Sequence, residues 1–311
     1  MSDMAALQAR ITSVSETKKV TDAMNRISSV KMTRAKREVE NTATYFRAIK
    51  EEIGELFRHI PETTNRYFKV PAPDGGGHRT HGILLVTSDK GLAGAYNKTA
   101  IGVAESVMAR HPETVLFIVG EYGRQHFASR GLPFVEDFLY SAQQPTVWKA
   151  RQICTDLLAY YDSGRVDEIN IIYTDFKGGR VGQCKRNILL PLDRSRFATD
   201  DARAAREVGE DEKAFFPDPD SVLMGVVPSY LTGFIYSSLV DSYCSEQQAR
   251  MMAMSAASHN AEEMLRELRL RRNRMRQAAI TREITEITSG ARAIRRMSEA
   301  HSQGGETVND R

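Results

Sequence analysis

The sequence predicts a mixed α+β and α/β fold, in which the N- and C-terminal helices form a long antiparallel coiled coil around an inserted Rossmann-like α/β domain. Three observations predict this fold class. Helical periodicity at both ends of the chain runs further than one domain can bury. The middle of the chain alternates strand-like and helix-like segments. A Pro- and Gly-rich stretch, residues 61–81, separates the first helix from that middle part.

The C-terminal helix is expected over residues 221–297, starting near Ser221 or just after Pro228. Between Arg250 and Ile294 it contains no proline and a single glycine. Apolar or small residues recur three and four positions apart, whereas arginines occupy much of the remaining surface. At about 1.5 Å per residue such a helix requires a partner along its length. Residues 298–311 lack an apolar face and are expected to be a disordered tail.

The N-terminal helix is expected over residues 1–60 and ends where Pro61 disfavours helical geometry. Its apolar positions follow helical spacing near both ends, but its middle carries several lysines and arginines. We therefore expect well-packed ends and a basic middle that faces solvent or a partner.

The α/β domain is expected over residues 82–192. Three apolar runs have the length of buried strands, at 82–87, 115–119 and 169–173. Helix-like segments at 98–110, 122–129 and 146–161 alternate with them. Continuous apolar runs are typical of a parallel sheet that is covered on both faces. This order predicts a small doubly wound domain.

Charge and cysteine content restrict the function classes. The formal net charge is +3, and the positive charge gathers in the two terminal segments, which favours an acidic partner. The three cysteines are far apart and form no metal-binding pattern. We find no apolar run near the roughly 20 residues that span a bilayer and no signal peptide.

Two local patterns suggest other functions. The glycine-bearing turn from Thr87 to Asn97 could present backbone N–H groups to a phosphate, but it matches neither GxGxxG nor the P-loop. The alternative is a strand-to-helix turn whose glycines permit tight packing. The histidines are scattered and form no catalytic motif, so we expect neither enzyme activity nor a cofactor or metal.

The arginine cluster from Arg266 to Arg276 is consistent with a coiled-coil nucleic-acid-binding adaptor in which the α/β domain is a passive insert. Aromatic residues that would stack on bases are absent from this stretch. A solvated coiled-coil face and a surface for an acidic protein partner are the alternatives.

Five short segments, spread over nearly the whole chain, match the motifs of one known family. Residues 276–287, RQAAITREITEI, are close to its C-terminal signature, and residues 245–254 also match it. Residues 87–94, TSDKGLAG, resemble its motif SDRGLCGG. Residues 19–24 and 31–32 resemble its N-terminal motifs KITKAM and SKM. By these motifs the chain resembles the gamma subunit of F-type ATP synthases.

The resemblance implies a central rotor shaft that is not itself catalytic. One copy would turn inside a ring of alpha and beta subunits, with its α/β domain against the epsilon subunit and the c-subunit ring. It would couple ion flow to ATP synthesis or hydrolysis from the cytoplasmic face of a bacterial inner membrane, as a peripheral subunit that binds no nucleic acid. The resemblance assigns partner contacts to the following residues: Met24, Lys31, Arg276, Gln277, Thr281 and Glu283.

The chain departs from the family pattern at three places. Polar or β-branched residues occupy an N-terminal stretch that is usually apolar and Ala-rich: Arg26, Ser28, Ser29 and Val30. Arg282 stands where glutamine is common. The chain also continues past Ala293, near where gamma subunits usually stop. We expect this extension to be a flexible protrusion that rotation does not require.

Overall fold

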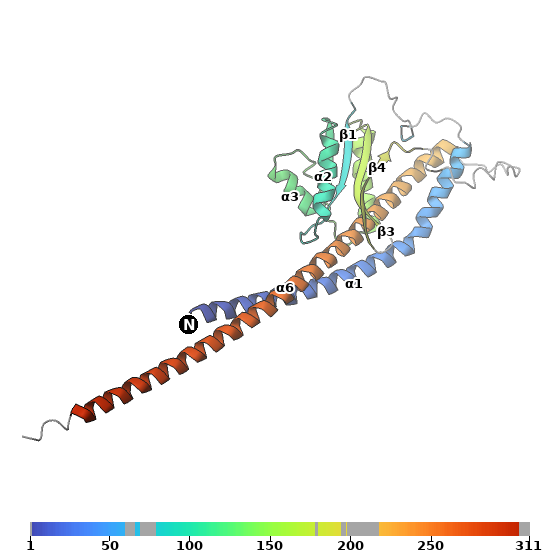
Figure 1. Cartoon of the computed structure of the whole chain (residues 1–311). Coiled ribbons are helices and arrows are strands. Elements are labelled where there is room, and N and C mark those ends of the chain that lie inside the picture. The colour runs from blue at the N-terminus through green and yellow to red at the C-terminus, as the bar shows by residue number, and fades with distance from the viewer. Residues whose placement is uncertain are drawn as a thin grey trace, which may run out of the picture. The chain divides into compact units, whose positions relative to one another are not determined.

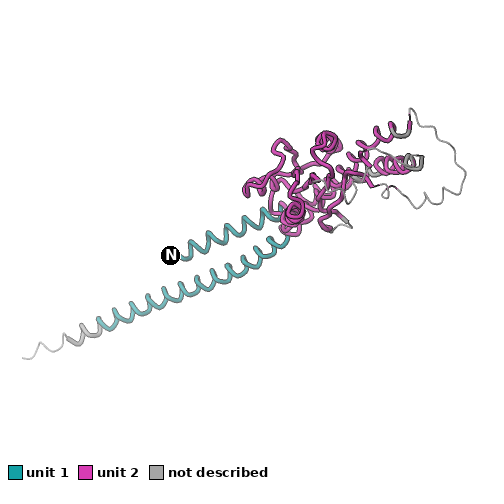
Figure 2. The backbone as a smooth tube through the Cα atoms, turned by 90° about the horizontal axis from the view of Figure 1, so that it is seen from above, with its two compact units in different colours: residues 1–23, 255–311 teal, residues 24–254 magenta. Residues whose placement is uncertain are grey.

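The computed structural model describes residues 2–59, 66–68, 79–177, 180–193, 197 and 218–304. It divides into two compact units (Figure 2). The first, which we call the coiled-coil unit, comprises Met1–Ala23 and Ser255–Arg311, and the second, the α/β unit, comprises Met24–Met254. Helices α1 (Ser2–His59) and α6 (Pro219–Gly304) contribute residues to both units.

The coiled-coil unit pairs the start of α1 with the second half of α6. Leu7 and Ile11 of α1 are buried against Leu265 of α6. Near the start of α1, Gln8 accepts a hydrogen bond from Arg272. Asp22 accepts one from Ser258 further along. Because higher numbers on α1 meet lower numbers on α6, the two helices run antiparallel, which confirms the predicted coiled coil.

The α/β unit contains a four-stranded sheet in the order β2-β1-β3-β4. Strands β1, β3 and β4 are labelled in Figure 1. Strand β1 (His81–Val86) is parallel to both β2 (Thr114–Val119) and β3 (Glu168–Lys177). Strand β4 (Arg180–Leu190) is antiparallel to β3 at the edge of the sheet. The sequence analysis missed β4 and predicted only parallel strands. An edge strand with polar residues has no continuous apolar run, so it lacked the pattern on which the prediction relied.

Both faces of the sheet are covered, as the Rossmann-like prediction requires. Helices α2 (Tyr96–Met108) and α3 (Glu121–Ser129) supply one apolar cluster, together with inward-facing side chains of β1 and β2. Helix α4 (Val147–Asp162) and the first half of α6 supply the other cluster. Neighbouring β1 residues alternate between the two clusters, because successive strand side chains point to opposite faces.

Helix α6 is longer than predicted at both ends. It begins at Pro219 and continues through Pro228, because Leu223, Val227 and Leu231 around this proline are buried in the core. Packing of this face outweighs the missing N–H of one proline. The helix ends at Gly304, so the expected disordered tail is helical from 298 to 304. The remainder of the tail, and most of the stretches 61–81 and 193–220, lie outside the described residues.

The residues Ser221–Met297 of α6 include an 18-residue window with a mean hydropathy of 1.4, which by length and composition alone could cross a membrane. Of that window, 56% is buried inside the protein. Packing in the core accounts for its apolar character, so the window is weak evidence for a membrane span.

A pair of glycines in α6 tests how closely α1 and α6 pack in the α/β unit. Gly233 is buried, and a Cβ placed on it would overlap the ring of Phe46 on α1. We expect Gly233→Ala to lower the free energy of unfolding by about 1–3 kcal/mol, since the ring must move. Thermal unfolding of the full chain measures the effect.

Gly225 provides the matched control in the same helix. It is exposed, and a Cβ there would meet nothing within 4 Å. Gly225→Ala should therefore stabilise the protein by about 0.5–1 kcal/mol through helix propensity alone. Equal effects of the two substitutions would contradict the close packing at Gly233.

Candidate partner-binding surfaces

The turn that follows β1, residues 88–94, is held by side chains of its own unit. The backbone N–H of Ser88 donates to Oδ1 of Asn97 at 2.9 Å. The Nδ2 of Asn97, in the first turn of α2, donates to Oγ of Ser88 at 2.7 Å. Leu92 adopts a left-handed conformation, with φ of 65°. These contacts fix the path of the backbone from β1 into α2.

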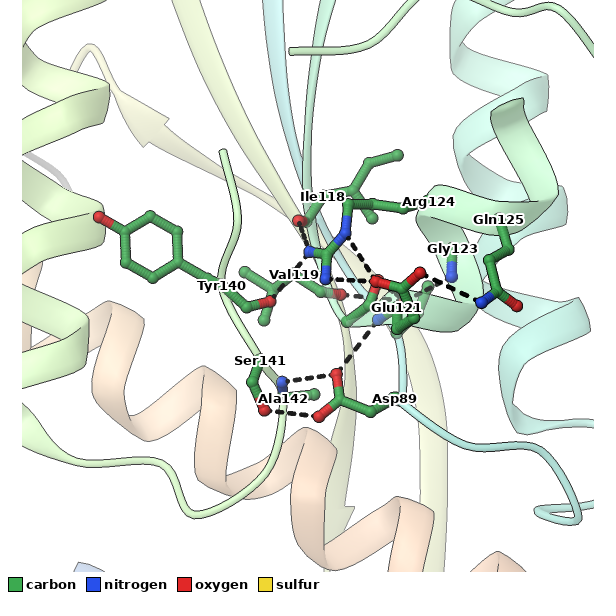
Figure 3. A network of polar contacts seen from close by, with 12 residues as sticks. Asp89, Ile118, Val119, Glu121, Gly123, Arg124, Gln125, Tyr140, Ser141 and Ala142 are labelled. Atoms are coloured by element: carbon green, nitrogen blue, oxygen red, sulfur yellow. Dashed lines mark hydrogen bonds and ion pairs between the residues drawn. The ribbon is translucent and has the colours of Figure 1, made fainter. Parts of the chain in front are cut away.

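Asp89 connects this turn to two other segments (Figure 3). Its carboxylate accepts hydrogen bonds from the backbone N–H groups of Glu121 and Ala142, both at 3.1 Å. It also accepts one from Oγ of Ser141 at 2.5 Å. Burial alone would raise the pKa of Asp89, but these hydrogen bonds hold it below its usual value. Since Glu121 begins α3, Asp89 supplies the negative charge that the N-terminus of this helix favours.

Arg124 of α3 secures the other side of the same network (Figure 3). Its Nη2 donates to Oε2 of Glu121 at 2.7 Å, and its Nη1 donates to the carbonyl of Tyr140 at 3.2 Å. The loop that carries residues 140–142 is thus joined to α3 from both sides.

An ion pair of α6 packs against the turn. Nη1 of Arg250 donates to Oε1 of Glu246 at 2.5 Å. Its Nη2 donates to the carbonyls of Lys90 and Gly91, at 3.0 and 3.1 Å. Glu246 is 4% exposed and Arg250 7%. Burial raises the pKa of Glu246, and the adjacent guanidinium opposes that rise. Removing either partner would leave the other buried and uncompensated, which is costly.

The contacts of the turn bear on whether it binds a nucleotide. In open sheets of this kind, ligands bind at the carboxyl ends of strands where the strand order reverses, here between β1 and β3. Two carbonyls of the turn already accept hydrogen bonds from Arg250, and its Asp89 carries a negative charge that would repel a phosphate. The geometry therefore favours the packing interpretation of the turn over phosphate binding.

Two of the predicted contact residues, Met24 and Lys31, lie beside the turn in the α/β unit. They line a groove of about 240 Å³ between α1, the turn and α6. Met24 is half-buried and Lys31 is exposed. Ile27 and Leu92, which are 54% and 64% exposed, are apolar members of the groove, and Lys90 adds a second cation. The groove thus offers apolar contact area next to positive charge.

One of the α1 residues that depart from the family pattern, Ser28, lines this groove. Ser28 is buried, Ser29 is half-buried, and Arg26 and Val30 are exposed. The small Ser28 side chain therefore occupies the packed side of α1, whereas Arg26 and Val30 face solvent.

The other four predicted contact residues, Arg276, Gln277, Thr281 and Glu283, lie on α6 in the coiled-coil unit. Every residue from 276 to 297 is exposed; we call this segment the overhang. Met275 is the last residue of α6 that packs partly against the cluster of Leu7, Ile11 and Leu265.

The overhang carries exposed apolar side chains at helical spacing. Ile280, Ile284 and Ile287 lie four and three residues apart, and are exposed, so they form one stripe. Arg276 and Glu283 are seven residues apart and share a face next to that stripe. Thr281 donates to the carbonyl of Gln277 at 2.9 Å, within the helix itself.

The predicted contact residues thus form two sets, one in each unit, and the structure brings together the members within each set. Sequence reasoning gave no role to Asp89, Glu246 or Arg250. One signal was present for the ion pair, because Glu246 and Arg250 stand four residues apart in a segment predicted to be helical.

Among the described residues, no group of three or more His, Cys, Asp or Glu side chains could hold a metal ion. Three of the described histidines face carboxylates instead. Nδ1 of His81 lies 3.5 Å from Oε1 of Glu168. His126 of α3 lies 3.0 Å from Oε1 of Glu105 on α2. His259 lies 3.5 Å from Oε1 of Glu263, one turn further along α6.

Comparison with known proteins identifies the family. A family model described as ATP synthase matches residues 3–294. The ATP synthase gamma chain of Caldanaerobacter subterraneus is 40% identical over 289 residues, covering 91% of this chain and 97% of that protein. The ATP synthase gamma chain of Ruminiclostridium cellulolyticum is 34% identical over 293 residues, covering 94% and 99%.

A solved structure shares the fold. A chain of the Euglena gracilis mitochondrial ATP synthase, in a structure of OSCP, F1 and the c-ring, matches with a TM-score of 0.63 at 13% identity. The match covers 100% of this chain and 98% of the other. With the full-length sequence matches above, this chain belongs to the family of ATP synthase gamma chains.

Proposed function

We propose that this gamma chain acts on the catalytic subunits through two contact surfaces, the overhang of α6 and the groove beside the turn. The gamma chain is the central rotor shaft of an F-type ATP synthase and is not catalytic itself. Its rotation couples transmembrane ion flow to ATP synthesis or hydrolysis, which takes place at the beta subunits.

The overhang is the observation that carries this proposal. Residues 276–297 form a helix of roughly 33 Å at 1.5 Å per residue, and every one of them is exposed. A single helix without tertiary contacts is marginal in water. The exposed isoleucine stripe and the charged residues beside it suit a partner that surrounds the helix.

In the proposed contacts of the overhang, Arg276, Gln277, Thr281 and Glu283 meet loops of the beta subunits. Arg276 and Glu283 offer opposite charges, and Gln277 offers an amide that can donate and accept hydrogen bonds. As the shaft rotates, this surface must leave each of the three beta subunits in turn. Contacts through exposed charged and polar groups suit this need, because such contacts are individually weak.

The groove would receive an acidic segment of a beta subunit near Met24 and Lys31. Lys31 and Lys90 supply positive charge, while Met24, Ile27 and Leu92 supply apolar area. A partner helix that presents carboxylates beside apolar side chains complements this combination.

The remaining contacts of the assembly are also part of the proposal. The overhang and the coiled-coil unit would lie within the ring of alpha and beta subunits. The α/β unit would meet the epsilon subunit and the c-subunit ring. One copy per complex would work as a peripheral subunit at the cytoplasmic face of a bacterial inner membrane.

The nucleic-acid adaptor is not supported. The relatives that match over most of this chain are ATP synthase gamma chains. The arginine cluster from Arg266 to Arg276 also lacks aromatic side chains for base stacking.

Reconstitution tests the proposed function directly. The alpha and beta subunits are purified with and without this chain, and their ATP hydrolysis and the rotation of a bead attached to the chain are recorded. We expect sustained rotary hydrolysis only with the chain present. Equal activity without it, and no rotation with it, would contradict the rotor function.

The double substitution Arg276→Ala and Gln277→Ala should lower ATP turnover of the reconstituted assembly by roughly three- to tenfold, equivalent to about 0.7–1.4 kcal/mol in the barrier. The reason is that the side chains proposed to contact the beta loops are removed. The isolated chain should keep its unfolding temperature, since both side chains are exposed. A matched control, Arg295→Ala with Arg296→Ala, lies on the same exposed helix beyond the family match. Unchanged turnover in the first variant would eliminate the proposed role.

Truncation after Ala293 should leave coupled ATP synthesis and hydrolysis unchanged. The match to the family model ends at residue 294, although α6 continues to Gly304. All but one of the removed residues therefore lie beyond the part that the family model matches. ATP synthesis in reconstituted vesicles measures the effect, and abolished coupling would show that rotation requires the extension.

A further inference from the structure

The loop that precedes α4, residues 141–146, is held by side chains on two sides. Nζ of Lys149, in the first turn of α4, donates to the carbonyl of Ser141 at 3.0 Å and to that of Gln143 at 2.7 Å. From the turn after β1, Asp89 accepts two further hydrogen bonds from this loop. We call residues 141–146 the anchored loop.

The anchored loop contains a residue in a rare backbone conformation. Gln144 has a φ of 47°, in the left-handed region. Residues other than glycine seldom adopt this region, because their Cβ crowds the backbone. Such a conformation persists only where the surrounding structure fixes the backbone, and it is often found at functional sites. The side chains of Gln143 and Gln144 are both exposed.

The anchored loop forms one wall of a second groove, of about 160 Å³, and α1 forms another. Lys31 and Gln143 line both this groove and the groove of Met24 described above. The two grooves therefore adjoin, and we call them together the trough. Arg34 and Glu38 of α1 line the second groove, so the trough continues about two helical turns beyond Lys31.

The charges of the trough favour an acidic partner. The two carboxylates that line it are already neutralised, since Glu38 lies 3.2 Å from Nε of Arg34 and Glu246 is paired within α6. Lys31 and Lys90 form no ion pair with any residue in the described part of the chain. Their two positive charges are therefore available to carboxylates of a partner.

The anchored loop adds hydrogen-bonding groups to these charges. The amides of Gln143 and Gln144 can each donate and accept hydrogen bonds. Because Gln143 and Lys31 line the same part of the trough, a carboxylate that binds Lys31 can accept a second hydrogen bond from Gln143. The loop thus complements the charge of α1 from the opposite wall.

We propose that the acidic segment of a beta subunit lies along the whole trough, from Met24 to Arg34, and that Lys149 positions the loop that forms its second wall. Gln143 and Gln144 are the side chains of the loop that meet the segment. Lys149 acts through the loop, because its ammonium is bound to two loop carbonyls. The identity of the partner rests on the proposed function above, whereas the second wall and the positioning residue are additional to it.

Photo-cross-linking tests the second wall. The chain carries p-benzoylphenylalanine in place of Gln143 and is assembled with alpha, beta and epsilon subunits. Illumination should link this position to a beta subunit, and mass spectrometry of the linked peptide should locate the link in an acidic segment. The matched control is Gln125, an exposed glutamine of α3 that lines neither groove. The same replacement at Gln125 should give no link to beta.

Three outcomes would overturn the second wall: a link from Gln143 to alpha or epsilon, no link at all, or an equal link to beta from Gln125. Bead rotation by the assembly with the unsubstituted chain separates these outcomes from a failure of the rotor function. If that assembly rotates and Gln143 gives no link to beta, the rotor function stands and the second wall is wrong.

Two substitutions of Lys149 test the positioning role. Lys149→Met removes both hydrogen bonds to the loop, so ATP turnover of the assembly should fall roughly two- to fivefold, as the loss of such bonds predicts. The yield of the Gln143 cross-link should fall with it. Lys149→Arg can donate to both carbonyls and should restore both readouts. A lower unfolding temperature of Lys149→Met with unchanged turnover and cross-link yield would show a purely structural role and overturn the positioning role.

Discussion

The α/β unit depends on the contact between Arg250 of α6 and the turn after β1. One guanidinium neutralises Glu246 and satisfies the carbonyls of Lys90 and Gly91, in a place that is closed to water. A buried charge is tolerated only when its hydrogen bonds are complete. The arrangement therefore defines one register between α6 and the turn. A shift by one residue would leave the buried charges of Arg250 and Glu246 without their hydrogen bonds. On the far side of the turn, Asp89 connects the same backbone to α3. The turn after β1 thus connects the sheet to both α6 and α3.

Helix α6 is buried along its first half and exposed along the overhang. This difference explains which of its properties the sequence predicts. Where the helix crosses the sheet, residues such as Leu231, Ile235 and Leu239 are buried in the core. In the overhang all residues are exposed, but the small and apolar residues keep helical spacing. Periodicity therefore identified a long helix in need of partners, and confirmed family membership supplied the context. Periodicity does not show where the buried part of α6 ends, because that end depends on which other elements pack against the helix.

Two features that the sequence did not predict have different physical causes. Strand β4 pairs with β3 directly before it, whereas the role of Asp89 depends on contacts between segments far apart in the chain. Asp89 contacts residues more than 30 positions away, and an isolated aspartate in a turn carries no local sign of such partners. Lys185 and Arg186 made β4 resemble a solvated segment, although charged residues are common on edge strands, where they discourage pairing with another sheet. A polar run of strand length, placed directly after a predicted strand, was the available signal.

The distribution of buried polar groups suits a rotor. A shaft that transmits torque must not slip against the domain that turns with it. Arg250, Ser242 and Ser245 of α6 hold the sheet and its turn through buried hydrogen bonds. Slippage would break all of these hydrogen bonds together, so they resist it. The surface that meets changing partners needs the opposite property. Exposed charges such as those on the overhang interact weakly in water, so the proposed contact with one beta subunit would be released without a large barrier. The same helix therefore combines a costly-to-break attachment in the α/β unit with an easily exchanged surface at residues 276–297.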